Sequence, residues 1–340
     1  MRGMHGVVAV GLCVGAVSVV TAQPIVVQRS APDLDRWNYP FNASAGFRTS
    51  ASTFAAPAGD PDFDDRDAQF LIGWDTAAEV PVGLAPTRYA ITSVVVTVTT
   101  ISDGVITFDP TTDPFESYLD PADPGFIADA DTGRPIELFG VGFRNGFDVQ
   151  TWTEFTAFQL APFGFWQGTR NAFATDFKAK TARDISRHVE QRFTPTPFAV
   201  GQAAGVAAGG SVPFDTLWTF TLDVSNPDVR AYLRRALQAG RLRLMATSMH
   251  AAPTMGQGVQ NWPDYYTREN KFAIPLGFAA TLNLTVDLTS GADLNDDGVV
   301  NGGDISVILN QFGGPGDADL NGDGVVNGAD ISVVLNAFGP

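Results

Sequence analysis

The sequence predicts a mainly β protein in which an antiparallel, jelly-roll-like β-sandwich body with one surface helix is followed by a small helical module. Two observations support this prediction. Residues 23–290 contain repeated segments in which apolar residues occupy every second position, with Gly and Pro frequent between them. Residues 291–340 instead contain a duplicated segment in which apolar residues recur at helical spacing.

Alternating segments identify the strands of the body, because the side chains of a β-strand point alternately to its two faces. One apolar set then faces a core, and the intervening residues face solvent. The clearest sets are Val94, Val96 and Val98; Trp218, Phe220, Leu222 and Val224; and Leu282, Leu284, Val286 and Leu288. We predict strands over 242–247 and 279–288 on either side of the later loops.

One stretch of the body has the signals of a helix instead. Asn226 is a predicted N-cap, Pro227 suits the first helical residue, and Gly240 suits the end. The apolar stripe between them consists of Val229, Tyr232, Leu233, Ala236 and Leu237. This pattern predicts an amphipathic surface helix that ends at Gly240.

The C-terminal duplication carries a metal-binding pattern. Residues 292–313 read ADLNDDGVVNGGDISVILNQFG and residues 318–339 read ADLNGDGVVNGADISVVLNAFG, with 18 of 22 aligned positions identical. Each copy fits D-x-[DN]-x-[DN]-G with an acid at position 12, the spacing of oxygen ligands in an EF-hand loop. Ca²⁺ binds about six to eight oxygens, so a short loop must turn sharply and point alternate side chains inward.

Each loop therefore offers one calcium site, and we expect two bound ions. Gly at position 6 permits the turn, the residue at position 7 offers its backbone carbonyl, and Asn at position 9 acts through water. The predicted ligands are Asp293, Asn295, Asp297, Val299, Asn301 and Asp304 in the first loop, and Asp319, Asn321, Asp323, Val325, Asn327 and Asp330 in the second.

A short amphipathic helix is predicted after each loop. The apolar faces consist of Ile305, Ile308, Leu309 and Phe312 in the first helix, and of Ile331, Val334, Leu335 and Phe338 in the second. Helices of this length are unstable alone in water, so the two must share a core. We expect calcium binding and folding of residues 291–340 to be one event.

Two tandem loop-helix calcium motifs at the C-terminus resemble a type I dockerin over residues 292–339. The resemblance implies calcium binding and attachment to a cohesin-like or other extracellular protein partner, often a scaffold that assembles polysaccharide-degrading enzymes. The family often has a Ser-Thr type pair at loop positions 10 and 11, where this chain has Gly302-Gly303 and Gly328-Ala329. The family's basic residues late in the helix are also missing, since no Lys or Arg follows Lys271.

Residues 1–22 have the features of a signal peptide. Arg2 supplies a basic start, residues 7–20 form an apolar run, and small residues up to Ala22 offer a cleavage site. This run is shorter than the roughly 18 residues of a transmembrane helix, and no later segment approaches that length. We therefore expect secretion, with an uncleaved anchor as the alternative. Cys13 is the only cysteine, so the mature chain would contain neither a disulfide nor a thiol nucleophile.

The formal net charge of −16 indicates which partners the chain is unsuited to bind. Nucleic acids and anionic membrane surfaces are themselves negative, so a strongly acidic protein is repelled by both. The acidic composition instead suits an extracellular protein whose Asp-rich loops bind calcium.

Aromatic residues in a polar loop form a candidate ligand surface on the body. Trp262, Tyr265 and Tyr266 lie in QNWPDYYTREN, and sugar rings stack on such side chains. The alternative is that these rings cap the end of the sandwich core. The segments 66–76 and 91–100 are similar to strands of carbohydrate-binding sandwiches found beside dockerin modules, which implies a glycan ligand.

The sequence identifies no catalytic residue. It contains no zinc-protease, nucleophile-elbow, phosphate-loop or dinucleotide-binding motif. A glycosidase needs only two carboxylates in a cleft, and Glu137, Glu154 and Glu190 are candidates among many acids. His188 and His250 fit loop or strand-end positions better than ligand positions.

Two acidic loops of the body offer oxygen ligands for additional calcium ions. The first spans Asp60 to Asp65, and the second contains Asp129 and Asp131. The alternative for each is a solvated turn, and the sequence leaves both alternatives open.

These observations favour a secreted, non-catalytic binding or structural protein whose body is attached by the calcium module to an extracellular or cell-surface partner. One alternative is an extracellular polysaccharide-acting hydrolase displayed by the same tail. Another is a structural surface component in which the sandwich packs against copies of itself.

Overall fold

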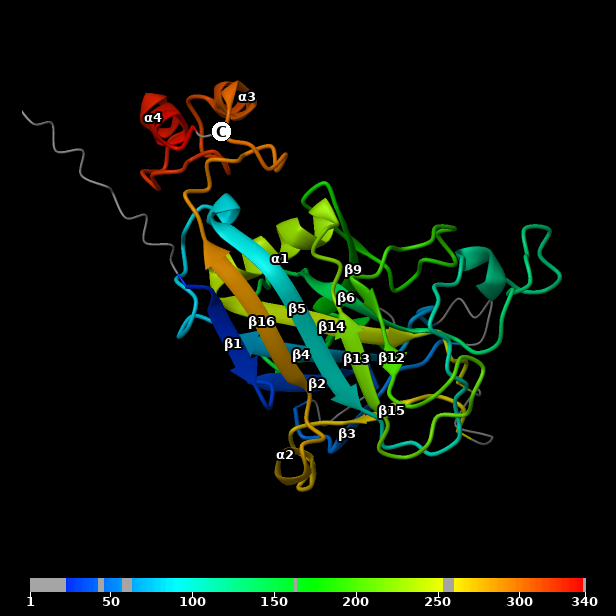
Figure 1. Cartoon of the computed structure of the whole chain (residues 1–340). Coiled ribbons are helices and arrows are strands. Elements are labelled where there is room, and N and C mark those ends of the chain that lie inside the picture. The colour runs from blue at the N-terminus through cyan, green and yellow to red at the C-terminus, as the bar shows by residue number, and fades with distance from the viewer. Residues whose placement is uncertain (1–22, 42–45, 57–62, 162–163, 253–259, 339–340) are drawn as a thin grey trace, which may run out of the picture.

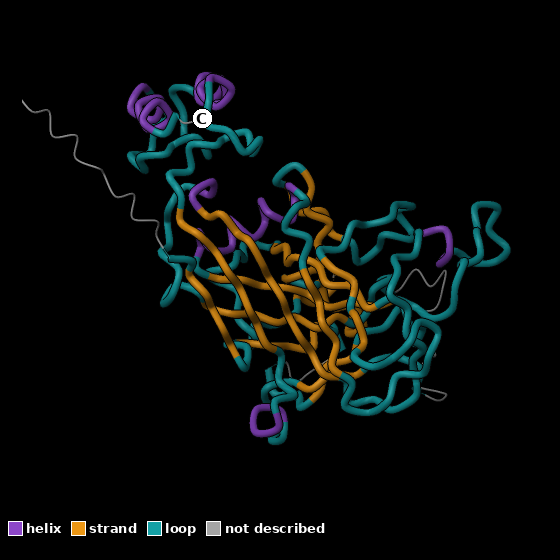
Figure 2. The backbone as a smooth tube through the Cα atoms, in the orientation of Figure 1, coloured by secondary structure: helices purple, strands orange, loops and turns teal. Residues whose placement is uncertain are grey.

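The computed structural model describes residues 23–41, 46–56, 63–161, 164–252 and 260–338 (Figure 1). It confirms the mainly β prediction, because two antiparallel sheets form the layers of the body and two helices form a separate group near the C-terminus (Figure 2). The expected signal peptide lies outside the described residues.

The sheet that faces the viewer in Figure 1 is called the front sheet. Its strands have the order β1-β16-β5-β13-β12, and every neighbouring pair is antiparallel. Their bounds are β1 Ile25–Arg29, β16 Thr281–Leu288, β5 Tyr89–Thr99, β13 Leu217–Thr221 and β12 Gln202–Ala203. The last strand of the body therefore lies beside the first.

The second layer, called the back sheet, has the order β10-β9-β6-β14-β4-β2, with β11 also paired to β6. Its bounds are β10 Thr181–Asp184, β9 Ala172–Lys178, β6 Ile136–Phe143, β14 Arg241–Ser248, β4 Gln69–Asp75, β2 Leu34–Asn38 and β11 Ala199–Val200. Two small pairs join β15 Asp264–Tyr266 to β3 Ser50–Ser52, and β7 Gln159–Ala161 to β8 Gly164–Thr169.

Burial confirms the alternation predicted for the front sheet. In β5, Val94, Val96 and Val98 are buried while Ser93 is exposed. The pairing with β16 shifts register at Thr92, which is the extra residue of a β-bulge. The bulge changes the alternation locally, so that Ile91 and Val94 both reach the core.

The back sheet differs because both of its faces are covered. In β6, Ile136 and Leu138 join the main core between the sheets, whereas Phe139 packs on the other side with Trp152 and Ile185. Trp152 and Ile185 belong to loops that cover this outer face. The inner back-sheet strands β9, β6, β14 and β4 are therefore buried almost continuously and lack an alternating pattern, whereas the edge strand β10 is mostly exposed.

Helix α1 (Pro227–Ala239) has the predicted boundaries. The Asn226 side chain accepts the Asp228 N–H at 2.9 Å, and Gly240 adopts the left-handed conformation with φ 71°. Leu233 and Leu237 are buried in the main core. Because α1 contacts β5 of the front sheet and β14 of the back sheet, it closes one end of the sandwich.

The remaining helices are short. They are η1 Pro86–Arg88, η2 Phe115–Tyr118, α2 Ala273–Leu276, α3 Gly302–Gln311 and α4 Gly328–Asn336. In the part of the chain that the structure describes, no helix combines the length and apolar character that crossing a membrane requires.

The tail leaves the body at the end of the sandwich that α1 closes (Figure 1). There the Arg234 guanidinium of α1 donates two hydrogen bonds to the Asp296 carboxylate, at 2.8 and 2.9 Å. Lys180 of the body also forms an ion pair with Asp317. These contacts connect body and tail, and a domain boundary at residues 290–291 stays a prediction.

A buried ion pair lies beneath the loops that cover the back sheet. Arg66 Nη2 is 2.6 Å from Glu137 Oε2, and both side chains are almost fully buried. Burial raises the pKa of the Glu137 carboxyl, and the Arg66 cation opposes that rise. Arg66 also donates to Thr247 of β14 at 2.5 Å, so the pair connects the start of β4 with β6 and β14.

Replacing Glu137 by Gln should lower the free energy of unfolding by about 3–5 kcal/mol, because Arg66 is left buried without its counter-charge. Urea titration of the full chain measures this change. The matched control is Glu79→Gln, which breaks the partly exposed pair of Arg29 and Glu79 and should cost less than about 1 kcal/mol. Equal losses in the two variants would contradict a structural role for the buried pair.

Candidate functional site

The first tail loop turns sharply around the side chain of Asp293. The two carboxylate oxygens of Asp293 accept the Asp297 and Gly298 N–H groups at 3.1 and 3.0 Å. Asn295 Oδ1 accepts the same Asp297 N–H at 3.1 Å. Gly298 at position 6 has φ 84°, a conformation that favours glycine. The oxygens at positions 1 and 3 are thus gathered on the inner side of one turn.

Asp304 at position 12 joins the start of this loop to the following helix. Its Oδ1 accepts the Leu294 and Asn295 N–H groups at 2.7 and 3.2 Å, and its Oδ2 accepts the Asn301 N–H at 2.9 Å. With the Asn301 side chain, it forms a capping box at the N-terminus of α3. Asp304 is fully buried, so both ends of the loop are fixed by one carboxylate.

The second loop repeats this arrangement. Asp319 Oδ2 accepts the Gly324 N–H at 2.8 Å, and Asp330 accepts the Leu320 and Asn327 N–H groups at 2.8 Å each. The Val325 N–H and the Asn321 side chain lower the pKa of Asp323 by donating to its carboxylate. The carboxylate at position 5 is therefore favoured in the charged form that binds a cation.

The donor set of both loops fits calcium. The residues predicted as ligands supply carboxylate, amide and backbone carbonyl oxygens, with neither sulfur nor imidazole among them, which suits a hard cation. The structure gathers these residues in two equivalent turns, and their individual roles as ligands stay a prediction.

The comparison with protein families agrees with this geometry. Residues 291–339 match the family model described as Dockerin type I domain. The tail is a dockerin-like module. Dockerin type I domains bind calcium, and the match supports attachment to a cohesin-bearing partner and an extracellular location. The match covers the tail alone, and the comparison with curated proteins gave no match.

The apolar faces of the two tail helices are only half buried, which corrects the expectation of a single core-facing stripe. Ile308 and Val334 are buried in the shared core, with Ile305 and Ile331 packed at its edge. The remaining residues are called the exposed apolar pairs: Leu309 of α3 with Phe312 just after that helix, and Leu335 of α4 with Phe338 just after that helix. Their exposed fractions are 58, 54, 51 and 46 %. Two short helices have too little facing surface to cover all four.

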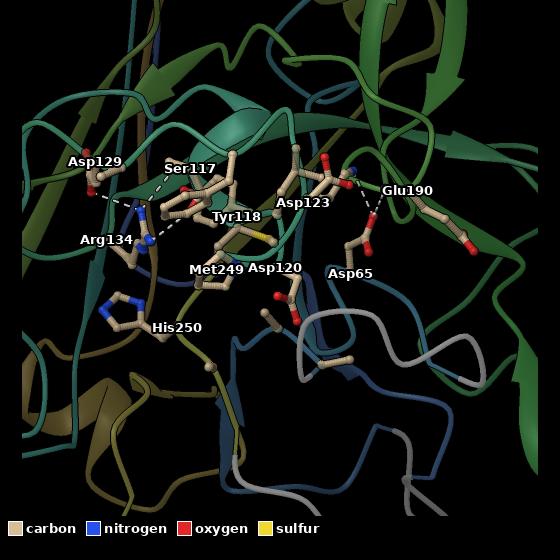
Figure 3. A pocket seen from close by; sticks show the side chains of 18 of the residues that line it. Asp65, Ser117, Tyr118, Asp120, Asp123, Asp129, Arg134, Glu190, Met249 and His250 are labelled. Atoms are coloured by element: carbon tan, nitrogen blue, oxygen red, sulfur yellow. Dashed lines mark hydrogen bonds and ion pairs between the residues drawn. The ribbon is translucent and has the colours of Figure 1, made fainter.

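The body contains a cavity of about 820 Å³ among the loops beside the back sheet (Figure 3). This volume is within the range of about 300–1,000 Å³ that is usual for ligand pockets. Tyr118, Arg134 and His250 lie on one side of the cavity, and Asp65 and Glu190 lie on the other (Figure 3).

His250 is the most unusual group in this cavity wall. It is 8 % exposed, and neither ring nitrogen has a hydrogen-bond partner in the described structure. Burial lowers the pKa of the imidazole to about 3, and the Arg134 cation adds to this effect. The ring is therefore neutral at physiological pH. His188 is also buried with a pKa well below its usual value, again mainly because of burial.

The three residues predicted to bind a ligand have different environments. Trp262 is partly exposed and contacts the Phe54 ring edge-on at 5.5 Å between centroids. Tyr265 is fully buried and stacks on Phe70, and Tyr266 is 5 % exposed. The burial of both tyrosines favours the core-capping alternative for them. Trp262 directly follows Asn261, which lines the cavity.

The candidate glutamates each have an arginine partner. Glu137 pairs with Arg66, Glu154 with Arg268, and Glu190 with Arg187. Of the three, Glu190 alone lines the cavity.

The first acidic loop is described only in part, because Asp60 and Asp62 lie outside the described residues. Asp64 forms ion pairs with Arg170 and Arg187, and Asp65 Oδ2 accepts the Val189 and Glu190 N–H groups at 2.8 and 3.1 Å. Burial raises the pKa of Asp65. These carboxylates therefore connect the loop to the residues that follow β10.

Sequence reasoning missed the residues that shape the cavity. Tyr118 ends η2, Arg134 precedes β6 and Met249 follows β14, and none of the three belongs to a motif. The available signal was weak: His250 follows the apolar run of β14, but nothing in the sequence indicates which loops lie beside it.

The double substitution Asp297→Ala with Asp323→Ala should abolish the calcium-dependent gain of helix in the tail, because each loop loses its carboxylate at position 5. Calcium titration of the full chain, followed by circular dichroism and calorimetry, measures the effect. Asp317→Ala is the matched control, since Asp317 lies between the loops. A double variant that still gains helix on calcium addition would overturn the ligand assignment.

Proposed function

We propose that this protein is an extracellular cargo in which a dockerin-like module with two calcium ions attaches a non-catalytic β-sandwich body to a cohesin-like or other extracellular partner. The observation that carries the proposal is the repeated loop geometry of residues 291–338, where equivalent carboxylates fix equivalent turns. Secretion through residues 1–22 is part of the proposal.

The exposed apolar pairs support a role in partner binding. Each pair lies on or just after a helix whose N-terminus is fixed by the buried carboxylate of its calcium loop. Exposed clusters of large apolar side chains on a small module indicate an interaction surface. Since the two pairs are equivalent by repetition, each helix offers the same kind of surface to a partner.

The cavity supports a ligand-binding role for the body. It combines an aromatic hydroxyl group, an arginine and several carboxylates with apolar groups such as Leu119 and Met249. Sugars present hydroxyl groups at their edges and apolar ring faces, and this combination of groups suits both. We propose that the body binds a glycan in this cavity, beside Trp262.

Substituting Asp for Leu309 and Leu335 together should lower affinity for a cohesin-bearing partner by about tenfold or more, because each helix loses an apolar contact. Binding to immobilised cohesin domains in calcium measures the effect, and calorimetry checks that calcium binding is retained. The control is Val82→Asp, which places the same charge at an exposed apolar position of the body. Unchanged binding by the double variant would contradict a role for these helices.

The variant Ala128→Trp should abolish retention of the full chain on insoluble polysaccharides, because Ala128 is exposed and lines the cavity, so an indole there would compete with a ligand for space. Retention and released reducing sugar are assayed together. Ala208→Trp, at an exposed alanine away from the cavity wall, is the matched control. Retention without release supports binding, release supports the hydrolase alternative, and no retention of the parent chain contradicts a glycan ligand.

A further inference from the structure

Four carboxylates from separate parts of the body converge beside the cavity. Asp109 and Asp113 follow the front-sheet strand β5, and Asp129 and Asp131 precede the back-sheet strand β6. One carboxylate oxygen from each of the four lies within 4.8 Å of the others. Oxygens that share a calcium ion at about 2.4 Å are at most twice that distance apart, so this spacing fits a common ion.

Asp109 has a buried oxygen without a partner. The residue is 1 % exposed, and its Oδ1 accepts the backbone N–H and the hydroxyl of Thr111 at 2.8 and 2.7 Å. Its Oδ2 is buried and has no hydrogen-bond partner in the described structure. Leaving such a charged oxygen desolvated and unpaired is costly, and a bound cation would satisfy it.

The protein groups around the four carboxylates do not balance their charge. Arg134 forms ion pairs with Asp113 and Asp129, at 2.7 and 2.9 Å, and no ion pair to Asp109 or Asp131 is found among the described residues. The Thr111 hydroxyl lies 2.7 Å from Asp109 and 3.0 Å from Asp131. A hydroxyl has one hydrogen, so it can donate to only one of these two carboxylates at a time.

We propose that Asp109, Asp113, Asp129 and Asp131 bind a third calcium ion, in the body of the protein and separate from the two loops of the tail. A donor set made of carboxylates, without sulfur or nitrogen, selects a hard cation. Calcium suits it better than magnesium, because calcium accepts irregular carboxylate arrangements and Mg²⁺ requires near-ideal octahedral geometry. The ion would join the segment after β5 to the segment before β6.

This ion would also stabilise one wall of the cavity. Asp129 and Arg134 both line the cavity, and the ion pair between them is drawn in Figure 3. Arg134 packs over the Tyr118 ring at 4.5 Å and donates to the Ser117 carbonyl oxygen at 3.2 Å. Fixing the carboxylates therefore fixes the arginine and, through it, the aromatic ring. The inference rests on this geometry and does not depend on the proposed glycan.

The test uses the full chain carrying Asp297→Ala and Asp323→Ala, so that the tail loops are disabled. Calorimetric titration with CaCl₂ should still detect one bound ion per chain. Adding Asp109→Asn or Asp131→Asn to this chain should weaken the remaining affinity by about tenfold or more, because the site loses a charged ligand. Asp287→Asn on β16 is the matched control and should leave the ion bound.

Thermal unfolding distinguishes loss of the site from misfolding. Calcium should raise the melting temperature of the tail-disabled chain relative to EDTA, since the ion binds the folded state. Asp109→Asn should remove that shift, and in EDTA it should melt at the same temperature as the parent or higher because repulsion is relieved. The proposal is overturned if the tail-disabled chain binds no calcium, or if neither Asn variant weakens binding.

Discussion

The rest of the structure depends on the position of β16 between β1 and β5 in the front sheet. Leu284 of β16 pairs with Val27 of β1 on one side and with Val94 of β5 on the other. The front sheet is therefore complete only when the end of the body returns to its beginning. Because β16 runs toward the end closed by α1, it also determines where the tail emerges. The first calcium loop is thereby brought to Arg234, which binds Asp296 at the body surface.

The two sheets differ in what covers them, and this difference places the candidate ligand site. The outer face of the front sheet presents hydroxyl groups, such as the hydrogen-bonded pair of Thr97 and Thr281, at 2.6 Å. The outer face of the back sheet is covered by long loops that bring charged groups with them, and Arg66 and Glu137 neutralise each other beneath these loops. The cavity lies among the same loops, which is where scaffolds usually carry binding residues. Its wall thus depends on the packing of irregular segments onto a rigid sheet.

The protein gathers acidic residues in two physically different ways. In the tail, Asp293 and Asp304 are eleven positions apart, and one turn with a glycine at position 6 brings them to the same loop. All residues of such a site lie within one short stretch of sequence, so the site can be recognised from residue spacing alone. In the body, Asp113 and Asp129 meet because η2 and the following turns fold back over the sandwich, with Arg134 between them. No spacing rule describes that contact, since it depends on the surrounding fold.

The sequence by itself determined the elements whose causes are local. Asn226 and Gly240 determine where α1 begins and ends, alternation in β5, β13 and β16 identifies the front sheet, and the loop pattern identifies the dockerin-like tail. Tertiary structure alone decided that the back sheet is buried on both faces, that Tyr265 packs in the core, and that Leu309 and Leu335 remain exposed. Tertiary structure also decided which residues line the cavity around His250. Local signals act through backbone geometry within a few residues, whereas burial depends on which distant segments come to cover a given face.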